Sequence, residues 1–246
     1  MEQGYRHIPI QAETHLTIDH LSVSYDGSRI LRNIDLVIGR GKITAVMGRN
    51  GMGKTTLLKA IVGLLEPDEG TIMLDETDIT EMEPDVRARM GLGYVPQGRE
   101  IFPRLTVEEN LRIGMEAREE KDEELADSMV FDLFPVLSQM KDRLGGNLSG
   151  GQQQQLAIAR ALVGKPRILI LDEPTEGIQP SIILEIEKVL QKLKEETDLT
   201  IILVEQYFEF ARKVADHISL IERGSVSLQG TADELSDDAI KSYLTF

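Results

Sequence analysis

The sequence predicts an α/β domain built around a parallel sheet, and three observations lead to this fold class. An apolar run at residues 43–47 ends at a glycine and is followed by a helical pattern from residue 54, which is the usual opening of a parallel α/β unit. Two further apolar runs, at residues 167–171 and 200–204, are flanked by helical patterns. Nearly continuous apolar strands are expected where both faces of a sheet are covered.

The N-terminal part has a different pattern. Residues 1–13 mix proline, glycine, glutamine and charged residues, and we expect a flexible tail there. From residue 16, apolar and polar residues alternate in two stretches separated by Asp26-Gly27, which predicts an antiparallel pair or meander of strands. Strand-like segments follow at residues 71–74 and 92–95.

Between the strands, residues 107–140 have a helical character, with many acidic residues and spaced leucine, methionine and phenylalanine. We interpret this segment as a helical insertion and its charged run at residues 116–127 as solvated helix surface. Near the end, apolar stretches on both sides of Arg223-Gly224 predict a hairpin. Thr231 and Glu234 have the spacing of a capping box, so we expect the last helix to begin there.

Composition excludes several classes of protein. The 246 residues include 42 acidic and 27 basic ones, for a net charge of −15, and no basic run offers a surface for nucleic acid, which we therefore exclude as a partner. The absence of cysteine excludes disulfides and thiolate chemistry. No segment approaches the ~20 apolar residues needed to cross a bilayer, so we expect any membrane association to depend on a partner.

A phosphate-binding loop is predicted at residues 48–55, which read GRNGMGKT and match G-x-x-x-x-G-K-[ST] between a strand and a helix. The glycines allow backbone N–H groups to point at a phosphate, and the helix N-terminus adds positive charge. Lys54 supplies a full charge for the β- and γ-phosphates, and the Thr55 hydroxyl can bind Mg²⁺. The alternative is a glycine-rich turn. The following helix should carry its apolar residues on one side, at Leu57, Leu58, Ile61 and Leu65.

Two carboxylates, Asp172 and Glu173, stand at the end of the predicted strand at residues 167–171. In an open α/β sheet, ligands bind at this edge. We expect Asp172 to hold Mg²⁺ and Glu173 to act as general base toward the attacking water. The alternative is a pair of surface carboxylates that cap the next helix.

Residues 148–152 read LSGGQ and combine a hydroxyl and two glycines with a helix start, without a lysine. This is a second anion-binding element. One chain therefore has two half-sites for one triphosphate, and two chains placed head to tail would complete both.

These three motifs resemble the Walker A, signature and Walker B motifs of ABC transporter ATPases, in the order typical of that family, and the similarity covers roughly residues 16–235. The resemblance implies a P-loop ATPase in a domain at residues 14–246, with a RecA-like parallel core, an antiparallel β subdomain and a helical subdomain at about 104–163. It also implies ATP and Mg²⁺ as cofactors. The implied partners are transmembrane permease subunits, a second ABC ATPase subunit in a homo- or heterodimer and, indirectly, a solute-binding protein, with the chain on the inner face of the cell membrane.

The resemblance also implies individual roles. Tyr25 would stack on adenine, unless it is an ordinary strand-end tyrosine, and Gln97 would bind Mg²⁺ and connect the nucleotide to the membrane subunits. A groove beside residues 98–104 would receive a helix of the membrane partner. The expected nucleotide-binding residues are Tyr25, Gly48, Arg49, Asn50, Gly51, Met52, Gly53, Lys54, Thr55, Thr56, Gln97, Ser149, Gly150, Gly151 and Gln152. The expected metal ligands are Thr55, Gln97 and Asp172, and the catalytic residues are Glu173 and Gln206.

Gln206 is a departure from the family, because many members have a histidine there. Its amide can donate a hydrogen bond but cannot become a cation. The four histidines of this chain lie elsewhere, and we assign none of them a catalytic role.

Local motifs at residues 96–99, 177–180 and 204–206 resemble the ATPases of branched-chain amino-acid and amide importers. The runs at 97–102, 151–155 and 205–210 are most similar to the second ATPase subunit of the urea importer. We therefore expect uptake of urea or a short-chain amide, with a branched-chain amino-acid importer as the alternative. A soluble ABC-type ATPase without a transport function, or a regulatory nucleotide-binding protein, remains a further alternative.

Overall fold

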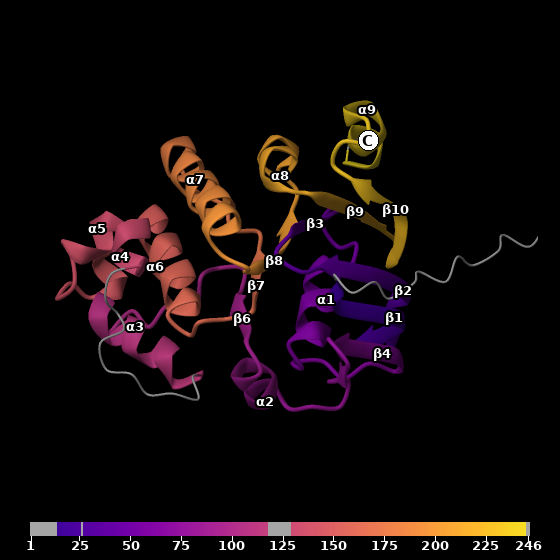
Figure 1. Ribbon diagram of the computed structural model, residues 1–246, viewed down its shortest axis with the longest axis horizontal. Coiled ribbons are helices and arrows are strands. Elements are labelled where there is room, and N and C mark those ends of the chain that lie inside the picture. Colours follow the sequence, from indigo (N-terminus) through magenta and orange to yellow (C-terminus); the bar gives the residue numbers. More distant parts are fainter. Residues whose placement is uncertain (1–13, 26, 118–128, 245–246) are drawn as a thin grey trace, which may run out of the picture.

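The computed structural model describes residues 14–25, 27–117 and 129–244, and these form two sheets and a lobe of helices (Figure 1). The expected tail at residues 1–13 and most of the charged run at 116–127 lie outside the described residues. The larger sheet has the strand order β10-β9-β3-β8-β7-β6. Its strands are β3 (Ile43–Met47), β6 (Leu92–Val95), β7 (Ile168–Asp172), β8 (Thr200–Glu205), β9 (His217–Glu222) and β10 (Ser225–Thr231).

The centre of this sheet is parallel, as predicted. β3 lies between β8 and β9, and β7 lies between β8 and β6, all in parallel pairs. Only β9 and β10 pair in antiparallel fashion, through the hairpin predicted at Arg223-Gly224. The carboxyl ends of β3, β7 and β8 therefore meet at one edge of the sheet.

Both faces of the parallel sheet are covered. Alternate residues of the central strands enter two different apolar cores; Ala45 packs with helices on one face, whereas Val46 packs with α1 and the second sheet on the other. All five residues of β3 and of β7 are buried. This two-sided burial explains why these strands are apolar throughout.

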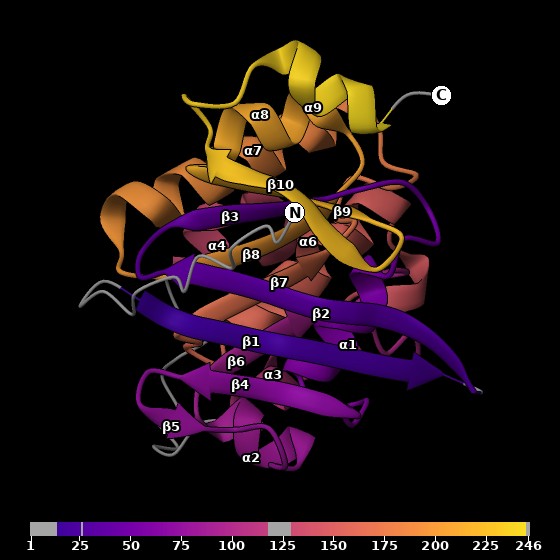
Figure 2. The same cartoon turned by 90° about the vertical axis from the view of Figure 1, so that its right-hand side faces the viewer.

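The second sheet is antiparallel, with the strand order β2-β1-β4-β5, and it forms a layer beside α1 (Figure 2). β1 and β2 pair along nearly their whole length, from Thr14 opposite Gly39 to Tyr25 opposite Ser28. The predicted pair is thus confirmed. The strands are β1 (Thr14–Tyr25), β2 (Ser28–Gly39), β4 (Glu69–Leu74) and β5 (Thr77–Asp78).

Helices α3 to α6 form the lobe beyond β6 and β7 (Figure 1). α3 begins at a Thr106–Glu109 capping box and packs against α6. α7 and α8 cover the neighbouring face of the sheet, and α9 follows β10. The helices are α1 (Lys54–Ile61), α2 (Pro84–Arg89), α3 (Val107–Gly114), α4 (Met129–Leu133), α5 (Pro135–Ser138), α6 (Gly150–Leu162), α7 (Pro180–Glu196), α8 (Phe208–Val214) and α9 (Asp237–Leu244), with short 3₁₀ turns at Met115–Ala117 and Gly145–Asn147.

Two expected helix boundaries are wrong. α1 ends at Ile61, before Leu65, because Gly63 has a φ of +82° and turns the chain away. Thr231 and Glu234 do form reciprocal backbone–side-chain hydrogen bonds of 3.0 and 3.3 Å, but these close a turn. α9 starts only at Asp237, where the Ser236 hydroxyl accepts from the Ala239 N–H at 3.2 Å.

Arg87 of α2 is fully buried and anchors the end of α1. Its Nη1 donates to the carbonyl oxygens of Ala60 and Ile61 at 2.7 and 2.8 Å. Its other nitrogens donate to the carbonyls of Met82 and Thr80, both at 2.8 Å. Carbonyls at a helix C-terminus lack intrahelical partners, so the Arg87 guanidinium satisfies the last turn of the helix that begins at the phosphate loop.

His15 joins the antiparallel sheet to the parallel one. Its side chain is 1% exposed, and its Nδ1 lies 2.7 Å from the Thr200 hydroxyl. Burial, together with the nearby charges of Arg40 and Arg167, lowers the pKa of His15 to about 4. The imidazole is therefore neutral in the folded protein at neutral pH.

Among the described residues, no helix combines the length and the apolar composition that a membrane crossing requires.

Candidate functional site

The predicted phosphate loop lies between β3 and α1, as expected. Gly53, at the N-terminus of α1, has a φ of +103°, which is accessible to glycine and strained for other residues. Gly48 packs against the backbone of β9; a Cβ added there would lie 2.5 Å from the Ile221 carbonyl oxygen. Two of the glycines are thus required by the course of the chain.

Lys54 points back into this loop. Its side chain is 4% exposed, and its Nζ donates to the carbonyl oxygens of Gly48 and Arg49 at 2.8 and 3.1 Å. Nζ also lies 3.3 Å from Glu173 Oε1. A buried ammonium held over backbone carbonyls at a helix N-terminus is well placed to bind an anionic ligand.

Asp172 is the last residue of β7, and Glu173 follows it. The two are 1% and 8% exposed, so they are not surface carboxylates that cap a helix. The hydroxyls of Thr55 and Tyr94 donate to the two oxygens of Asp172 at 3.4 and 3.5 Å. Burial raises the pKa of Asp172 above its ordinary value, as does the neighbouring charge of Glu173. This buried carboxylate has only long contacts with neutral donors and lies beside a hydroxyl. Such oxygen ligands are those that Mg²⁺ prefers, and the residues fit that ion.

Glu173 is the centre of the cluster. Gln206 Nε2 donates to its Oε1 at 2.8 Å, and Gln97 Nε2 donates to its Oε2 at 3.3 Å. Gln97 also donates to Glu176 at 2.9 Å. The backbone of Glu173 has a φ of +48°, which is uncommon outside glycine and recurs at functional sites. The structure therefore brings Lys54, Gln97 and Gln206 around one carboxylate.

Sequence reasoning missed the role of Glu205, the last residue of β8. Its side chain is 2% exposed, and Oε1 accepts from the N–H and hydroxyl of Thr175 at 3.1 and 2.7 Å. Oε2 accepts from the N–H groups of Gln206 and Tyr207 at 3.0 and 3.1 Å. Burial raises the pKa of Glu205, against the effect of these hydrogen bonds. The sequence did contain a signal for this role, because Glu205 is an acidic residue at the end of a largely apolar strand.

The segment at residues 148–152 begins α6. Ser149 is the N-cap; its hydroxyl accepts from the Gln152 N–H at 3.3 Å, and Gln152 Oε1 accepts from the Ser149 N–H at 2.9 Å. Gly151 packs against α7, since a Cβ there would lie 2.7 Å from Ile182. Within the described chain, no hydrogen bond joins this segment to the phosphate loop, and β6 and β7 lie between α6 and α1 (Figure 1). The two predicted half-sites are therefore separate in one protomer.

The remaining predicted residues lie around the phosphate loop. Tyr25 ends β1 with 59% of its surface exposed, as a stacking platform requires. A cavity of about 700 Å³ opens beside the loop and also reaches α9; its walls include Gly48, Arg49, Asn50, Met52, Gln206, Arg223 and Tyr243. Thr56 follows Thr55 in the first turn of α1, and Gly51 has a φ of +77°.

An apolar groove of about 410 Å³ lies between α2, α3 and α6. Leu64, Phe102 and Ile113 line it and are 55%, 43% and 40% exposed. The Arg160 guanidinium lies over the Phe102 ring, 5.1 Å from its centre. Phe102 belongs to the segment at residues 98–104, beside which a groove was expected.

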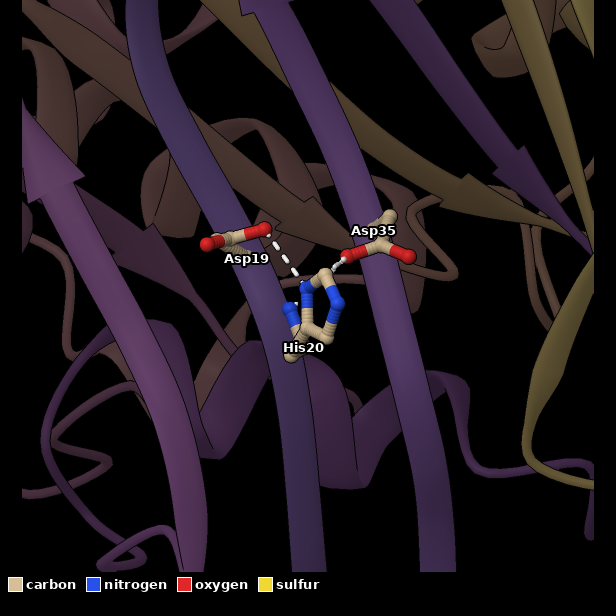
Figure 3. Close-up of side chains that lie close together, drawn as sticks. All are labelled: Asp19, His20 and Asp35. Carbon is tan, nitrogen blue, oxygen red and sulfur yellow. Dashed lines mark hydrogen bonds and ion pairs between the residues drawn. The ribbon is translucent and has the colours of Figure 1, made fainter. Parts of the chain in front are cut away.

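A separate titratable cluster lies on the antiparallel sheet, where His20 Nδ1 is 2.7 Å from Asp19 Oδ1 and 3.1 Å from Asp35 Oδ1 (Figure 3). The hydrogen bond to Asp19 and the charge of Asp35 raise the pKa of His20. All three side chains are at least one-third exposed. The contacts of the histidine with two carboxylates account for this cluster.

Comparison with known proteins identifies the family. Residues 31–176 match the ABC transporter family. The chain is 40% identical over 215 residues to the probable branched-chain amino acid transport ATP-binding protein LivF of Archaeoglobus fulgidus, covering 87% of this chain and 91% of that one. It is 36% identical over 220 residues to the high-affinity branched-chain amino acid transport ATP-binding protein BraG of Pseudomonas aeruginosa, covering 89% and 94%. It is also 31% identical over 225 residues to the lipopolysaccharide export system ATP-binding protein LptB of Escherichia coli, covering 91% and 93%.

Solved structures agree with this assignment. The ATP-binding subunit of an ABC transporter superposes with a TM-score of 0.84 at 27% identity, covering 95% of this chain and all of that one. The dimeric cassette MJ0796 bound to ADP and phosphate superposes with a TM-score of 0.78 at 26% identity, covering 88% and 98%. The predicted fold class is confirmed. The chain belongs to the ABC transporter family, as one of its ATP-binding and ATP-hydrolysing subunits.

Proposed function

We propose that two protomers hydrolyse ATP at shared sites and that the chain drives uptake by an importer of the branched-chain amino-acid group. The proposal of ATP hydrolysis rests on one observation: Lys54, Gln206 and Gln97 all contact Glu173 at the carboxyl edge of the sheet. These groups supply a phosphate-binding cation, a general base and two neutral donors that orient the base.

The proposed reaction is the in-line attack of water on the γ-phosphorus. Glu173 accepts the proton of the attacking water, the bond to the β-phosphate oxygen breaks, and ADP and phosphate leave. Lys54 offsets negative charge on the β- and γ-phosphates, and Tyr25 stacks on the base. Gln206 holds the Glu173 carboxylate in place through the 2.8 Å hydrogen bond.

Magnesium, when bound, would supply positive charge that neutralises the phosphates. Thr55 and Asp172 would hold it. Gln97 donates to Glu173 and Glu176 in this structure, so its amide oxygen would have to turn toward the ion to become a ligand.

Each site requires a second protomer, because the LSGGQ segment lies apart from the phosphate loop in one chain. Ser149 of the partner subunit and the amides of its two signature glycines would close over the γ-phosphate. A purified chain is then expected to show a specific ATPase activity that rises with protein concentration. A constant specific activity, with a strictly monomeric protein, would contradict the shared site.

The apolar groove at Leu64, Phe102 and Ile113 is the proposed docking site for a permease helix. Exposed apolar side chains of this kind mark protein–protein contacts. The proposed location on the inner face of the membrane follows from such docking, with a solute-binding protein delivering solute to the permease.

The solute is proposed from the relatives. The proteins at 40% and 36% identity are named as branched-chain amino-acid transport subunits, which favours leucine, isoleucine or valine over urea. Urea or a short amide is supported only by local motifs, such as the residues at 97–102 and 205–210. A relative named for lipopolysaccharide export matches at 31% identity, so identity alone does not determine the direction of transport.

The test is uptake of radiolabelled leucine and urea by source cells in which the gene has been deleted in frame. We expect leucine uptake to fall and to return with the wild-type gene but not with Lys54→Ala. Loss of urea uptake alone would reverse the choice of solute. Normal uptake of both would favour an ATPase outside these two transport systems.

A further inference from the structure

Arg99 lies against the N-terminus of α6, where the LSGGQ segment begins. A Cβ added to Gly150 would lie 3.1 Å from Arg99 Nη1 and 3.4 Å from Nη2. A Cβ added to Gly177, in the loop after β7, would lie 3.9 Å from Nη2. The guanidinium therefore sits between the start of the signature helix and the loop that follows Glu173.

This position is electrostatically unfavourable without an anion. The N-terminus of α6 carries the positive end of the helix dipole, and a cation is normally stabilising at the opposite end. In the described part of the chain, no carboxylate pairs with Arg99, whose one side-chain hydrogen bond is a long contact of 3.4 Å from Nη1 to Gln153 Oε1. The Arg99 guanidinium and the positive end of the α6 dipole thus face the same region of space.

The backbone fixes the approach of Arg99. Gly98, Arg99 and Glu100 have φ values of +82°, +73° and +44°. The Arg99 carbonyl accepts from Arg160 Nη2 at 3.4 Å, and its N–H donates to the Pro96 carbonyl at 3.1 Å. A left-handed backbone is strained for non-glycine residues, and this sharp turn brings the Arg99 backbone into contact with Arg160 of α6.

We propose that Arg99 binds the terminal phosphate of the nucleotide held by the second protomer, and so supplies the cation that the signature half-site lacks. This inference rests on the proposed shared site and adds a residue to it. A guanidinium can form two parallel hydrogen bonds to phosphate oxygens. The Gly150 and Gly151 amides, which have no acceptor within the described chain, complete an anion-binding surface with it.

One consequence concerns the loop itself. Gln97 contacts Glu173 of its own site, whereas Arg99, two residues later, faces the half-site that serves the other protomer. The same short loop also leads to Phe102 in the apolar groove. It therefore connects the groove with both nucleotides of the dimer.

The experiment uses the full-length chain in a Glu173→Gln background, in which hydrolysis does not remove the nucleotide. ATP-dependent dimerisation is measured by analytical ultracentrifugation for this parent, for added Arg99→Ala, for added Arg99→Lys, and for added Arg104→Ala. Arg104 is an exposed arginine of the same segment and is the matched control. Binding of a fluorescent ATP analogue to the monomer and thermal melting are measured in parallel.

We expect Arg99→Ala to weaken the ATP-bound dimer by about 10- to 100-fold, the effect of losing a hydrogen-bonded charge. Monomer nucleotide affinity should stay within about threefold, since the phosphate loop is untouched. Arg99→Lys should restore part of the dimer affinity, and Arg104→Ala should match the parent.

Dimerisation of Arg99→Ala equal to that of the parent would overturn the proposal. So would an equal loss of dimer affinity with ADP, because the effect would then not depend on the terminal phosphate. If the Glu173→Gln parent itself stays monomeric with ATP, the shared site is wrong and the role of Arg99 is wrong with it.

Discussion

The side-chain amide of Gln206 donates to Glu173 Oε1 at 2.8 Å. Many relatives were expected to use a histidine at this position, and the structure places the glutamine in direct contact with the proposed base. An amide does not titrate near neutral pH, so the donor in this contact stays neutral. The Lys54 ammonium lies 3.3 Å from the same oxygen of Glu173, and the Gln97 amide donates to the other oxygen, Oε2, at 3.3 Å.

Replacing Glu173 by glutamine should lower kcat by about 100-fold or more, the usual effect of losing a general base. ATP binding should persist because Lys54 remains, and the dimer should accumulate with ATP bound. Phosphate release and gel filtration measure the two effects. Glu176→Gln is the matched control, since Glu176 contacts Gln97 but not Lys54. A normal rate in Glu173→Gln would show that another group activates the water.

Replacing Lys54 by alanine should weaken nucleotide binding by about 100-fold or more, because a buried charged contact to phosphate is lost. Binding of a fluorescent ATP analogue measures the change. Lys59→Ala, on the exposed side of the same helix, should bind normally. Unchanged binding in Lys54→Ala would place the triphosphate elsewhere.

Glu205→Gln should reduce kcat by about 10-fold with little change in KM. The Glu205 carboxylate accepts hydrogen bonds from both loops, the one that carries Glu173 and the one that carries Gln206. One charged hydrogen bond is worth ~1.5–3 kcal/mol. A double-mutant cycle that combines Glu205→Gln with Gln206→Ala, measured on kcat, tests whether Glu205 acts by positioning Gln206. If Glu205 acts through Gln206, the double variant should be no slower than Gln206→Ala alone. Fully additive losses in kcat would mean that Glu205 acts independently of Gln206.

Tyr25→Ala should weaken ATP binding by about 2- to 10-fold, since stacking on an aromatic ring contributes ~0.5–1.5 kcal/mol beyond buried area. Tyr25→Phe should bind as the wild type does, because it keeps the ring. Isothermal titration with ATP and with inorganic triphosphate distinguishes base stacking from phosphate binding. Equal weakening for both ligands would assign Tyr25 a different role.

His15 should make the protein less stable in mild acid. Its pKa is about 4 in the folded state, against 6.5 for an unperturbed histidine. Its contribution to stability is therefore complete above pH ~6.5 and is lost as the pH falls toward 4, by about 2 kcal/mol at pH 5. Urea unfolding at pH 5.0 and 7.5 measures this loss, which should be smaller in His15→Gln. An equal loss in both proteins would assign the pH dependence to other groups.

The parallel strands could be predicted because burial on both faces leaves an unambiguous apolar run, as in β3 and β7. The phosphate loop, Asp172 and Glu173 could be predicted because their chemistry depends on local spacing and on position at a strand end. Ser149 and Gln152 were recognised as an anion-binding helix start, and the structure adds that they cap that helix.

Other features depend on contacts between distant segments. α1 stops before Leu65 because Gly63 turns the chain and Arg87 binds the last carbonyls, and neither effect is visible in the apolar pattern. The Thr231–Glu234 bonds form without a helix, since the same two hydrogen bonds can close a turn. The role of Glu205 depends on Thr175, which is 30 residues away in the chain, and the position of Arg99 depends on how its loop meets α6.

Arg87 connects the apolar groove with α1, the helix that begins at the phosphate loop. This one guanidinium lines the apolar groove and holds the final carbonyls of α1, while the first residues of α1 belong to the proposed phosphate-binding loop. The helix is 8 residues long, which corresponds to about 12 Å at the standard rise per residue. A protein docked in the groove and a nucleotide in the loop would therefore act on opposite ends of the same short helix.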